Sequence, residues 1–191
     1  FHHNVLAANG DYGLRVSPNN MSRLDATTVY GGADLGIPGS TGLNGKPFVY
    51  LDSGQLDETG THDWVPLDVP YLVTGDDGGY SGTAITIGSG SAAVLVQGTQ
   101  LAFGAGMQLT VSSGGTLGLA GEADNNVRLY AAPGADGWDG IWVAGGQLLA
   151  LHAELVDAGH GTLMQGAVSF RNPSGGHANL HLCHVTIRNP A

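Results

Sequence analysis

Two copies of one short phrase near the C-terminus decide the fold: Val168-Ser169-Phe170-Arg171-Asn172-Pro173 recurs, seventeen positions later, as Val185-Thr186-Ile187-Arg188-Asn189-Pro190. Four of the six positions are identical, and the other two exchange similar residues. A repeat of about twenty residues is typical of one turn of a β-solenoid, in which each turn buries its apolar face against the next turn. We therefore expect Phe170 to stack on Ile187, and Asn172 to align with Asn189, at a spacing of ~4.8 Å.

The composition favours strands joined by many turns. The chain of 191 residues contains 33 Gly, which helices tolerate poorly. Only 12% of the residues are charged, whereas a typical soluble domain has about a quarter. The hydrophobic content of 42% is nevertheless normal, so the chain is not a disordered tract.

The charge balance excludes two classes of partner. The formal net charge is −10, with six basic residues, so a nucleic-acid backbone or an anionic membrane surface would be repelled. No apolar run approaches the length of a membrane helix, and no membrane insertion is expected. The single cysteine, Cys183, cannot form an intrachain disulfide and is expected to be a small buried hydrophobe.

Short runs of β-forming residues recur along the chain and are separated by Gly, Asp, Asn, Ser and Pro. No stretch of eleven residues has a helical period, and the best helical candidate is a single turn at Asn19–Leu24. These patterns predict an all-β fold. The expected strands are residues 13–16, 26–30, 48–51, 71–74, 84–87, 93–97, 100–103, 108–111, 116–119, 127–130, 141–143, 148–151, 154–156, 167–170, 179–182 and 185–187.

A β-sandwich would also show regular short strands, but three features favour a solenoid. They are the echoed phrase, the matched Asn172 and Asn189, and the Gly at nearly every corner of residues 83–119. At roughly twenty residues per turn, one domain spanning residues 1–191 would hold about eight or nine turns. Residues 31–46 and 55–69 are rich in Gly, Pro and polar groups and are expected to be loop excursions.

Neither end of the chain reads as a capping unit, so both ends of the solenoid are expected to be uncapped. We therefore expect partners to be copies of the chain or flanking coils of a larger protein.

From Pro70 onward the order of the motifs resembles a known family. A Pro-Tyr entry at Pro70 is followed by strands such as Ala84–Ile87, by Gly-x-Leu turns, and by the motif Trp138-Asp139-Gly140-Ile141-Trp142. This order is similar to the right-handed parallel β-helix regions, of the pectate-lyase-like kind, in large bacterial surface and secreted proteins. The resemblance covers residues 70–191, and residues 1–30 resemble one further coil. The chain departs from the family at Ile87-Gly88-Ser89, where the usual Pro-Gly is missing and about a dozen extra residues follow.

The resemblance implies a right-handed parallel β-helix in an extracellular or cell-surface setting. It implies a structural, adhesive or assembly role more than a reaction. We therefore expect a non-enzymatic structural or adhesive module that joins end to end into filaments or forms part of a larger surface protein.

The alternative is a module that binds or cleaves polysaccharide. Exposed Trp138 and Trp142 would stack on sugar rings, and Asp136 and Asp139 would bind hydroxyl groups or act as acid and base. The competing interpretation is that one Trp closes the core at a corner, the other packs on the outer face, and the aspartates cap turns.

Other groupings of polar residues give no coherent site. The five histidines of the C-terminal third have no spacing typical of a zinc site, and His181 and His184 would point to opposite faces of a strand. His62-Asp63 has no nucleophile elbow to complete a triad. No catalytic residues, metal or cofactor are therefore expected.

Overall fold

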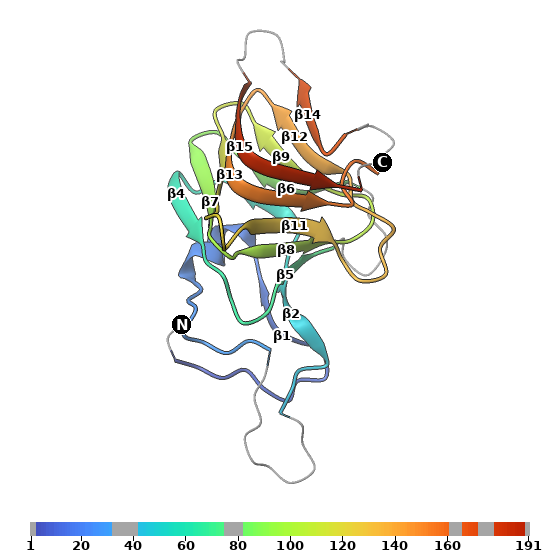
Figure 1. The fold of residues 1–191 in the computed structure, drawn as a ribbon. Coiled ribbons are helices and arrows are strands. Elements are labelled where there is room, and N and C mark those ends of the chain that lie inside the picture. The colour runs from blue at the N-terminus through green and yellow to red at the C-terminus, as the bar shows by residue number, and fades with distance from the viewer. Residues whose placement is uncertain (1–2, 32–41, 75–81, 161–165, 172–177, 190–191) are drawn as a thin grey trace.

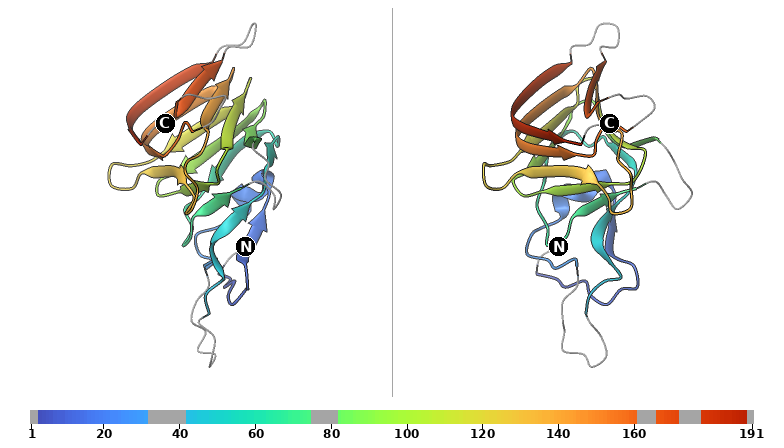
Figure 2. Two further views of the ribbon diagram at one scale, coloured as in Figure 1. Left: turned by 90° about the vertical axis from the view of Figure 1, so that its right-hand side faces the viewer. Right: turned by 45° about the vertical axis from the view of Figure 1, so that its right-hand side comes forward.

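The computed structural model describes residues 3–31, 42–74, 82–160, 166–171 and 178–189. These residues form a parallel β-solenoid of about 5 turns, with 56% strand and 4% helix. Figures 1 and 2 show the turns layered on one another, with β1 (Tyr12–Val16) and β15 (Asn179–Arg188) at opposite ends of the stack. The predicted all-β solenoid is confirmed. No helix in this part of the chain is long and apolar enough to cross a membrane.

The strands stack into three walls. The first wall contains β1, β2 (Lys46–Leu51), β5 (Tyr71–Val73), β8 (Gln100–Phe103), β11 (Val127–Ala131) and the second halves of β13 (Gln147–Val156) and β15. The second wall contains β3 (Gly54–Leu56), β6 (Gly82–Ile87), β9 (Met107–Ser112), β12 (Gly140–Ala144) and β14 (Val168–Arg171). The third wall contains β4 (Gly60–Trp64), β7 (Ser91–Val96), β10 (Thr116–Ala120) and the first halves of β13 and β15.

The turns are longer and fewer than the sequence predicted. Val49 lies opposite Tyr71, so that turn spans 71 − 49 = 22 residues. Leu148 lies opposite Leu180, so the last turn spans 180 − 148 = 32 residues. The prediction of eight or nine turns of roughly twenty residues was therefore wrong, because most turns also carry connecting segments between the walls.

The core lies inside the walls, where alternate residues of each strand point inward. One inward column on the first wall runs through successive turns: Leu14, Val49, Tyr71, Leu101, Leu129, Leu155 and Ile187. Its middle members are fully or almost fully buried. A single turn cannot enclose such residues alone, so each turn depends on the turns above and below it.

Glycines form the corner between the second and third walls, as the sequence predicted. Gly60, Gly90 and Gly114 occupy the same corner in three successive turns, and all three have positive φ. The amide of Gly60 donates to the carbonyl of Gly90, and the amide of Gly90 donates to that of Gly114, both at 3.0 Å. A left-handed backbone that repeats in three successive turns selects Gly because it has no Cβ.

Three local predictions differ from the structure. Residues 55–69, predicted as an excursion, contain β4 and the end of β3 and so belong to the walls. Residues 26–30 form no strand and contribute one parallel bridge at Val29. Cys183 points outward opposite Leu151 and is only partly buried. Of the other predicted excursion, 31–46, residues 32–41 lie outside the described residues.

The helical turn predicted at Asn19–Leu24 is a 3-10 helix, η1 (Pro18–Arg23). It packs against β3 and β4, where the second and third walls begin. Met21 is fully buried there, and the Asn19 amide donates to the Asp57 carboxylate at 2.7 Å. This end of the stack is therefore partly covered, whereas the sequence predicted two uncapped ends.

Candidate functional site

The opposite end of the stack exposes the core. Four apolar side chains of β14 and β15 face inward but remain exposed: Phe170 at 42%, Leu180 at 44%, Leu182 at 40% and Ile187 at 44%. Their partners one turn earlier are buried to 2% exposure or less: Val143, Leu148, Ala150 and Leu155. The contrast shows that the last described turn has an apolar surface of the kind that every earlier turn buries.

This turn also has unpaired strand edges. Among the described residues, β15 pairs only with β13, and β14 pairs only with β12. Each strand therefore presents backbone N–H and C=O groups along one edge, which is a template for a further strand. We call the surface formed by the free edges of β14 and β15 and by Phe170, Leu180, Leu182 and Ile187 the open end.

The expected stacking of Phe170 on Ile187 was wrong. Phe170 belongs to the second wall and pairs with Val143, whereas Ile187 belongs to the first wall and pairs with Leu155. Both residues stack on the turn beneath, but they lie on different walls of the same turn. Asn172 lies outside the described residues, so its alignment with Asn189 stays a prediction.

The two segments that do stack in register are the sequences of β13 and β15. Residues 147–157 (QLLALHAELVD) and 179–189 (NLHLCHVTIRN) align strand for strand, and both contain a corner at their sixth residue. The corner residues His152 and His184 have φ of 48° and 53°, and their rings stack at 4.6 Å with an angle of 2° between the planes. The signal that sequence reasoning missed was this pair of histidines, since the two segments share few other identities.

The predicted carbohydrate contacts are not brought together as a platform. Trp138 is fully buried, stacks on Phe103 at 4.3 Å, and donates from Nε1 to the Val156 carbonyl at 2.9 Å. The ring therefore closes the core, as the competing interpretation expected of one of the two Trp residues, and it presents no face to a sugar. Trp142 lies partly exposed on the outside of the second wall, where a ligand contact stays a prediction.

The two aspartates near Trp138 differ in environment. Asp136 is exposed, whereas Asp139 is partly buried, and desolvation raises the pKa of Asp139. Glu154, a further carboxylate of the C-terminal half, binds Arg128 and Arg188. The carboxylate therefore holds two arginines and is not poised as a general acid beside Asp139.

The histidines form no metal site in the part of the chain that the structure describes, where no group of three metal-binding side chains occurs. His177 lies outside this part. His62 is almost fully buried, and its Nε2 lies 2.7 Å from the Glu58 carbonyl oxygen. Asp63 lies on the outside of the same strand, so the two residues do not form a catalytic pair.

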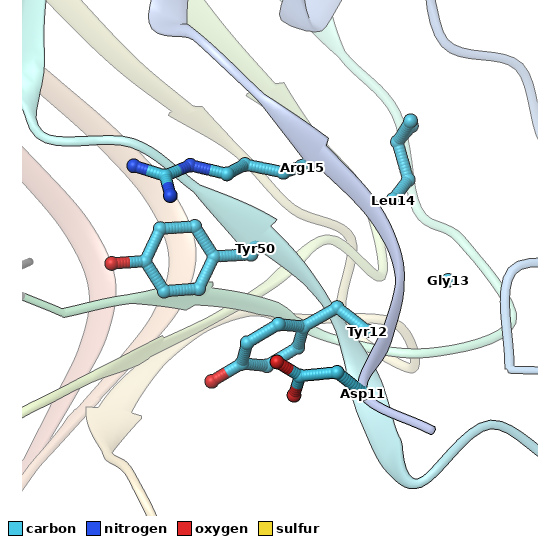
Figure 3. Close-up of a pocket in the computed structure, with 6 residues that line it drawn as sticks. All are labelled: Asp11, Tyr12, Gly13, Leu14, Arg15 and Tyr50. Atoms are coloured by element: carbon cyan, nitrogen blue, oxygen red, sulfur yellow. The ribbon is translucent and has the colours of Figure 1, made fainter. Parts of the chain in front are cut away.

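A pocket of about 350 Å³ lies on the outside of the first wall, between β1 and β2 (Figure 3). The Arg15 guanidinium lies over the Tyr50 ring at 5.0 Å and binds the Asp52 carboxylate at 2.5 Å. Next to the pocket, the Lys46 ammonium lies 4.4 Å from the centre of the Tyr12 ring. Hydrogen bonding to Asp11, at 2.8 Å, raises the pKa of this lysine.

The charges at and beside this pocket are therefore neutralised by ion pairs, Arg15 with Asp52 and Lys46 with Asp11. Each cation has a carboxylate partner and lies against a tyrosine ring, and the Tyr12 and Tyr50 rings are themselves 5.0 Å apart. Further along the same outer face, Phe48 and Tyr130 pack against Leu72, Ala102 and Ala132. A neighbouring pocket of about 420 Å³ includes Phe48 and Leu72 in its lining. This outer aromatic surface (Tyr12, Phe48, Tyr50 and Tyr130) ties successive turns together on the outside of the wall.

Comparison of the chain with protein-family models, with curated proteins and with solved structures finds no match.

Proposed function

We propose that the chain is a non-enzymatic structural module of an extracellular or cell-surface protein, a rigid segment of β-solenoid that joins a further coil through the open end. The observation that carries the proposal is the exposure of Phe170, Leu180, Leu182 and Ile187 beside unpaired strand edges. Monomeric proteins rarely leave such contiguous apolar surface uncovered. A further parallel coil would bury it as each earlier coil is buried.

Contacts between turns support the structural part of the proposal. Parallel ladders run through every wall, and the largest inward side chains are fully buried. On the outside, Glu154 links Arg128 and Arg188 across three turns. These contacts hold each turn against its neighbours, which is what a stiff rod requires.

The setting is proposed from the resemblance to β-helix regions of bacterial surface and secreted proteins. The acidic balance of the chain, −10, is compatible with a protein that stays soluble outside the cell. Detection of the full-length protein on intact cells with an antibody against this chain would test the setting, and signal only after cell lysis would contradict it.

Sedimentation velocity over a range of concentrations tests the open end with a matched pair of variants. Leu180 and Leu149 are both 44% exposed, but Leu180 faces the open end and Leu149 faces outward from the third wall. We expect the chain to associate with rising concentration. Leu180→Lys should weaken this association at least about tenfold, because it places a charge in the joined surface, and Leu149→Lys should not.

Equal behaviour of the two variants would contradict joining through the open end. A chain that remains monomeric at all accessible concentrations would contradict self-association, and the broader structural role would stand. Circular dichroism of both variants is the control for folding.

A second candidate function is carbohydrate binding, and the observation that favours it is the pocket beside Tyr12 and Tyr50. Tyrosine rings and carboxylates are groups that contact sugars, and the same face continues to Phe48 and Tyr130. A glycan array tests this function. Binding that is lost in Tyr12→Ala would support it, whereas the absence of any bound glycan would contradict it. Release of reducing ends that stops in Asp139→Ala would show a cleaving enzyme instead.

A further inference from the structure

The chain contains two Asn-Gly pairs, Asn9-Gly10 and Asn44-Gly45, and the structure places them side by side. Asparagine is a thermolabile residue, and a following Gly makes it more so. Because Gly has no side chain, its backbone nitrogen can attack the side-chain carbonyl carbon of the asparagine without hindrance. The two pairs share this chemistry, so their surroundings decide whether either of them reacts.

The Asn44-Gly45 pair is held in place on all sides. Asn44 is 6% exposed, and its Nδ2 donates to the carbonyls of Leu6 and Tyr30. Its Oδ1 accepts from the backbone nitrogen and the Nδ2 of Asn9, both at 3.0 Å. The nitrogen of Gly45, which would have to attack, donates to the Asn9 carbonyl at 2.8 Å. Reaction at Asn44 therefore requires these hydrogen bonds to open first.

The Asn9-Gly10 pair is exposed and far less restrained. No hydrogen bond joins the Gly10 amide to any of the residues that the structure describes. A Cβ at Gly10 would meet nothing within 4 Å, and its φ is not positive. The side-chain nitrogen of Asn9 is held by one hydrogen bond, to Asn44 Oδ1. The attacking nitrogen is therefore free, and the group that it attacks is tethered once.

From this contrast we infer that Asn9 is a site of spontaneous deamidation in the folded chain, whereas Asn44 is protected. The Gly10 nitrogen bonds to Asn9 Cγ, the bond from Cγ to Nδ2 breaks, and ammonia leaves with the proton of the Gly10 amide. Water then adds to either carbonyl of the resulting succinimide and breaks its bond to the ring nitrogen, which gives aspartate or isoaspartate. The inference is independent of the proposed joining role.

The product changes how residues 3–9 attach to the stack. In the unmodified chain both nitrogens of Asn9 donate to Asn44 Oδ1, and the Asn9 carbonyl accepts from Gly45. A carboxylate at position 9 replaces the donor Nδ2 by an oxygen that faces Asn44 Oδ1, so one attraction becomes a repulsion. Isoaspartate also inserts the side-chain Cβ into the main chain. We therefore expect deamidation to loosen residues 3–9 from residues 42–45.

Incubation of the folded chain at mildly alkaline pH, followed by proteolysis and mass spectrometry, tests the site. We expect deamidation of the peptide that contains Asn9 to be at least about tenfold faster than that of the peptide that contains Asn44. In denaturant neither pair is held, so the two rates should become similar.

Gly10→Ala is the matched variant. Its Cβ meets open space, so circular dichroism should show an unchanged fold, while the methyl group should slow the reaction of Asn9 at least about tenfold. Asn9→Asp supplies one product at full occupancy. In this variant hydrogen exchange should be faster at the amides of Ala8 and Gly45, which donate to Gly42 and Asn9 in the unmodified chain. The amide of Asp52, which donates to the Val16 carbonyl, is the control and should not change.

Equal rates at Asn9 and Asn44 in the folded chain would overturn the inference, and so would reaction of Asn9 only after unfolding. Undiminished deamidation of folded Gly10→Ala would also overturn it, because the attack by the Gly10 nitrogen would then not be the route. If Asn9→Asp leaves exchange at Ala8 and Gly45 unchanged, the expected loosening is wrong and the site of deamidation stands.

Discussion

The open end makes a quantitative prediction for one pair of residues of the same type. Leu148 and Leu180 lie opposite each other on successive turns, and both point inward. Leu148 is fully buried, whereas Leu180 is 44% exposed. Substitution of each leucine by alanine removes the same three carbon atoms. The difference in the lost free energy of unfolding therefore measures how completely each side chain is buried by the turns around it.

The magnitudes follow from the two environments. Three buried carbon atoms correspond to about 2.4 kcal/mol of transfer free energy, at ~0.8 kcal/mol each, and a closed cavity adds about 1 kcal/mol. Leu148→Ala should therefore lower the free energy of unfolding by about 3 kcal/mol. At Leu180 roughly half of the transfer term applies and no cavity is enclosed, so Leu180→Ala should lower it by about 1 kcal/mol.

The measurement is equilibrium unfolding in guanidinium chloride, followed by tryptophan fluorescence and circular dichroism, at concentrations where the chain sediments as a monomer. Coincidence of the two signals tests whether a single free energy describes the transition. Losses that agree within about 0.5 kcal/mol would refute the reasoning, because Leu180 would then be covered as well as Leu148 is.

Three further predictions concern the body of the solenoid. Gly140→Ala should lower the free energy of unfolding by several kcal/mol, because φ is +96° and a Cβ would lie 2.6 Å from the Ala167 carbonyl oxygen. Gly134→Ala is the control: φ is +87°, but a Cβ would meet open space, so this variant should lose only about 1 kcal/mol. Equal losses in thermal and chemical unfolding would contradict this account. Burial raises the pKa of Tyr71 above its usual 10.0, so this tyrosine favours folding below pH ~10, and that contribution is lost as the pH rises further. Tyr71→Phe also removes the 2.7 Å hydrogen bond that the Tyr71 hydroxyl donates to the Val65 carbonyl. Above pH ~10 the free energy of unfolding of this variant should fall less steeply with pH than that of the unmodified chain. The same dependence on pH in both proteins would contradict this prediction. Desolvation raises the pKa of Asp139, so ionisation of this carboxyl group disfavours folding as the pH rises through its pKa in the folded state. Asp139→Asn should therefore become more stable relative to the unmodified chain as the pH rises from acid to neutral. A relative loss of stability at neutral pH would contradict the raised pKa.

The fold class could be predicted from the sequence because it depends on local chemistry. Glycines that recur at Gly60, Gly90 and Gly114 select tight corners, and the alternation between them selects strands. The Pro18–Arg23 turn was also predictable, since its neighbours offer no apolar alternation. These features need only the preferences of each residue for backbone angles.

The register between turns could not be predicted in the same way. The phrases at 168–173 and 185–190 are alike because strands of two different walls alternate inward and outward side chains with the same period of two. The true partners, 147–157 and 179–189, share few identities, because an inward position accepts any apolar residue of suitable volume. The left-handed corners at His152 and His184 fix the register, and histidine is an uncommon choice for such a corner.

The candidate site was only partly accessible from the sequence. The sequence pattern predicted uncapped ends, but it could not show that η1 covers β3 and β4 while β14 and β15 stay open. The burial of Trp138 depends on Phe103, which lies in the preceding turn, and the binding of Glu154 depends on arginines from two other turns. Contacts between residues so far apart in the chain follow from the register, which the sequence pattern left open.

Hydrogen exchange along β15 most directly tests the claim that one edge of this strand is unpaired and becomes covered on association. It measures the protection of the backbone amides of the open end themselves. In dilute solution we expect slow exchange for amides that bond to β13 and fast exchange for the amides on the free edge. At concentrations where the chain associates, the fast amides of β15 should become protected while those of β1 change less. Equal protection of both edges of β15 in the dilute monomer, or no change in β15 on association, would contradict the account.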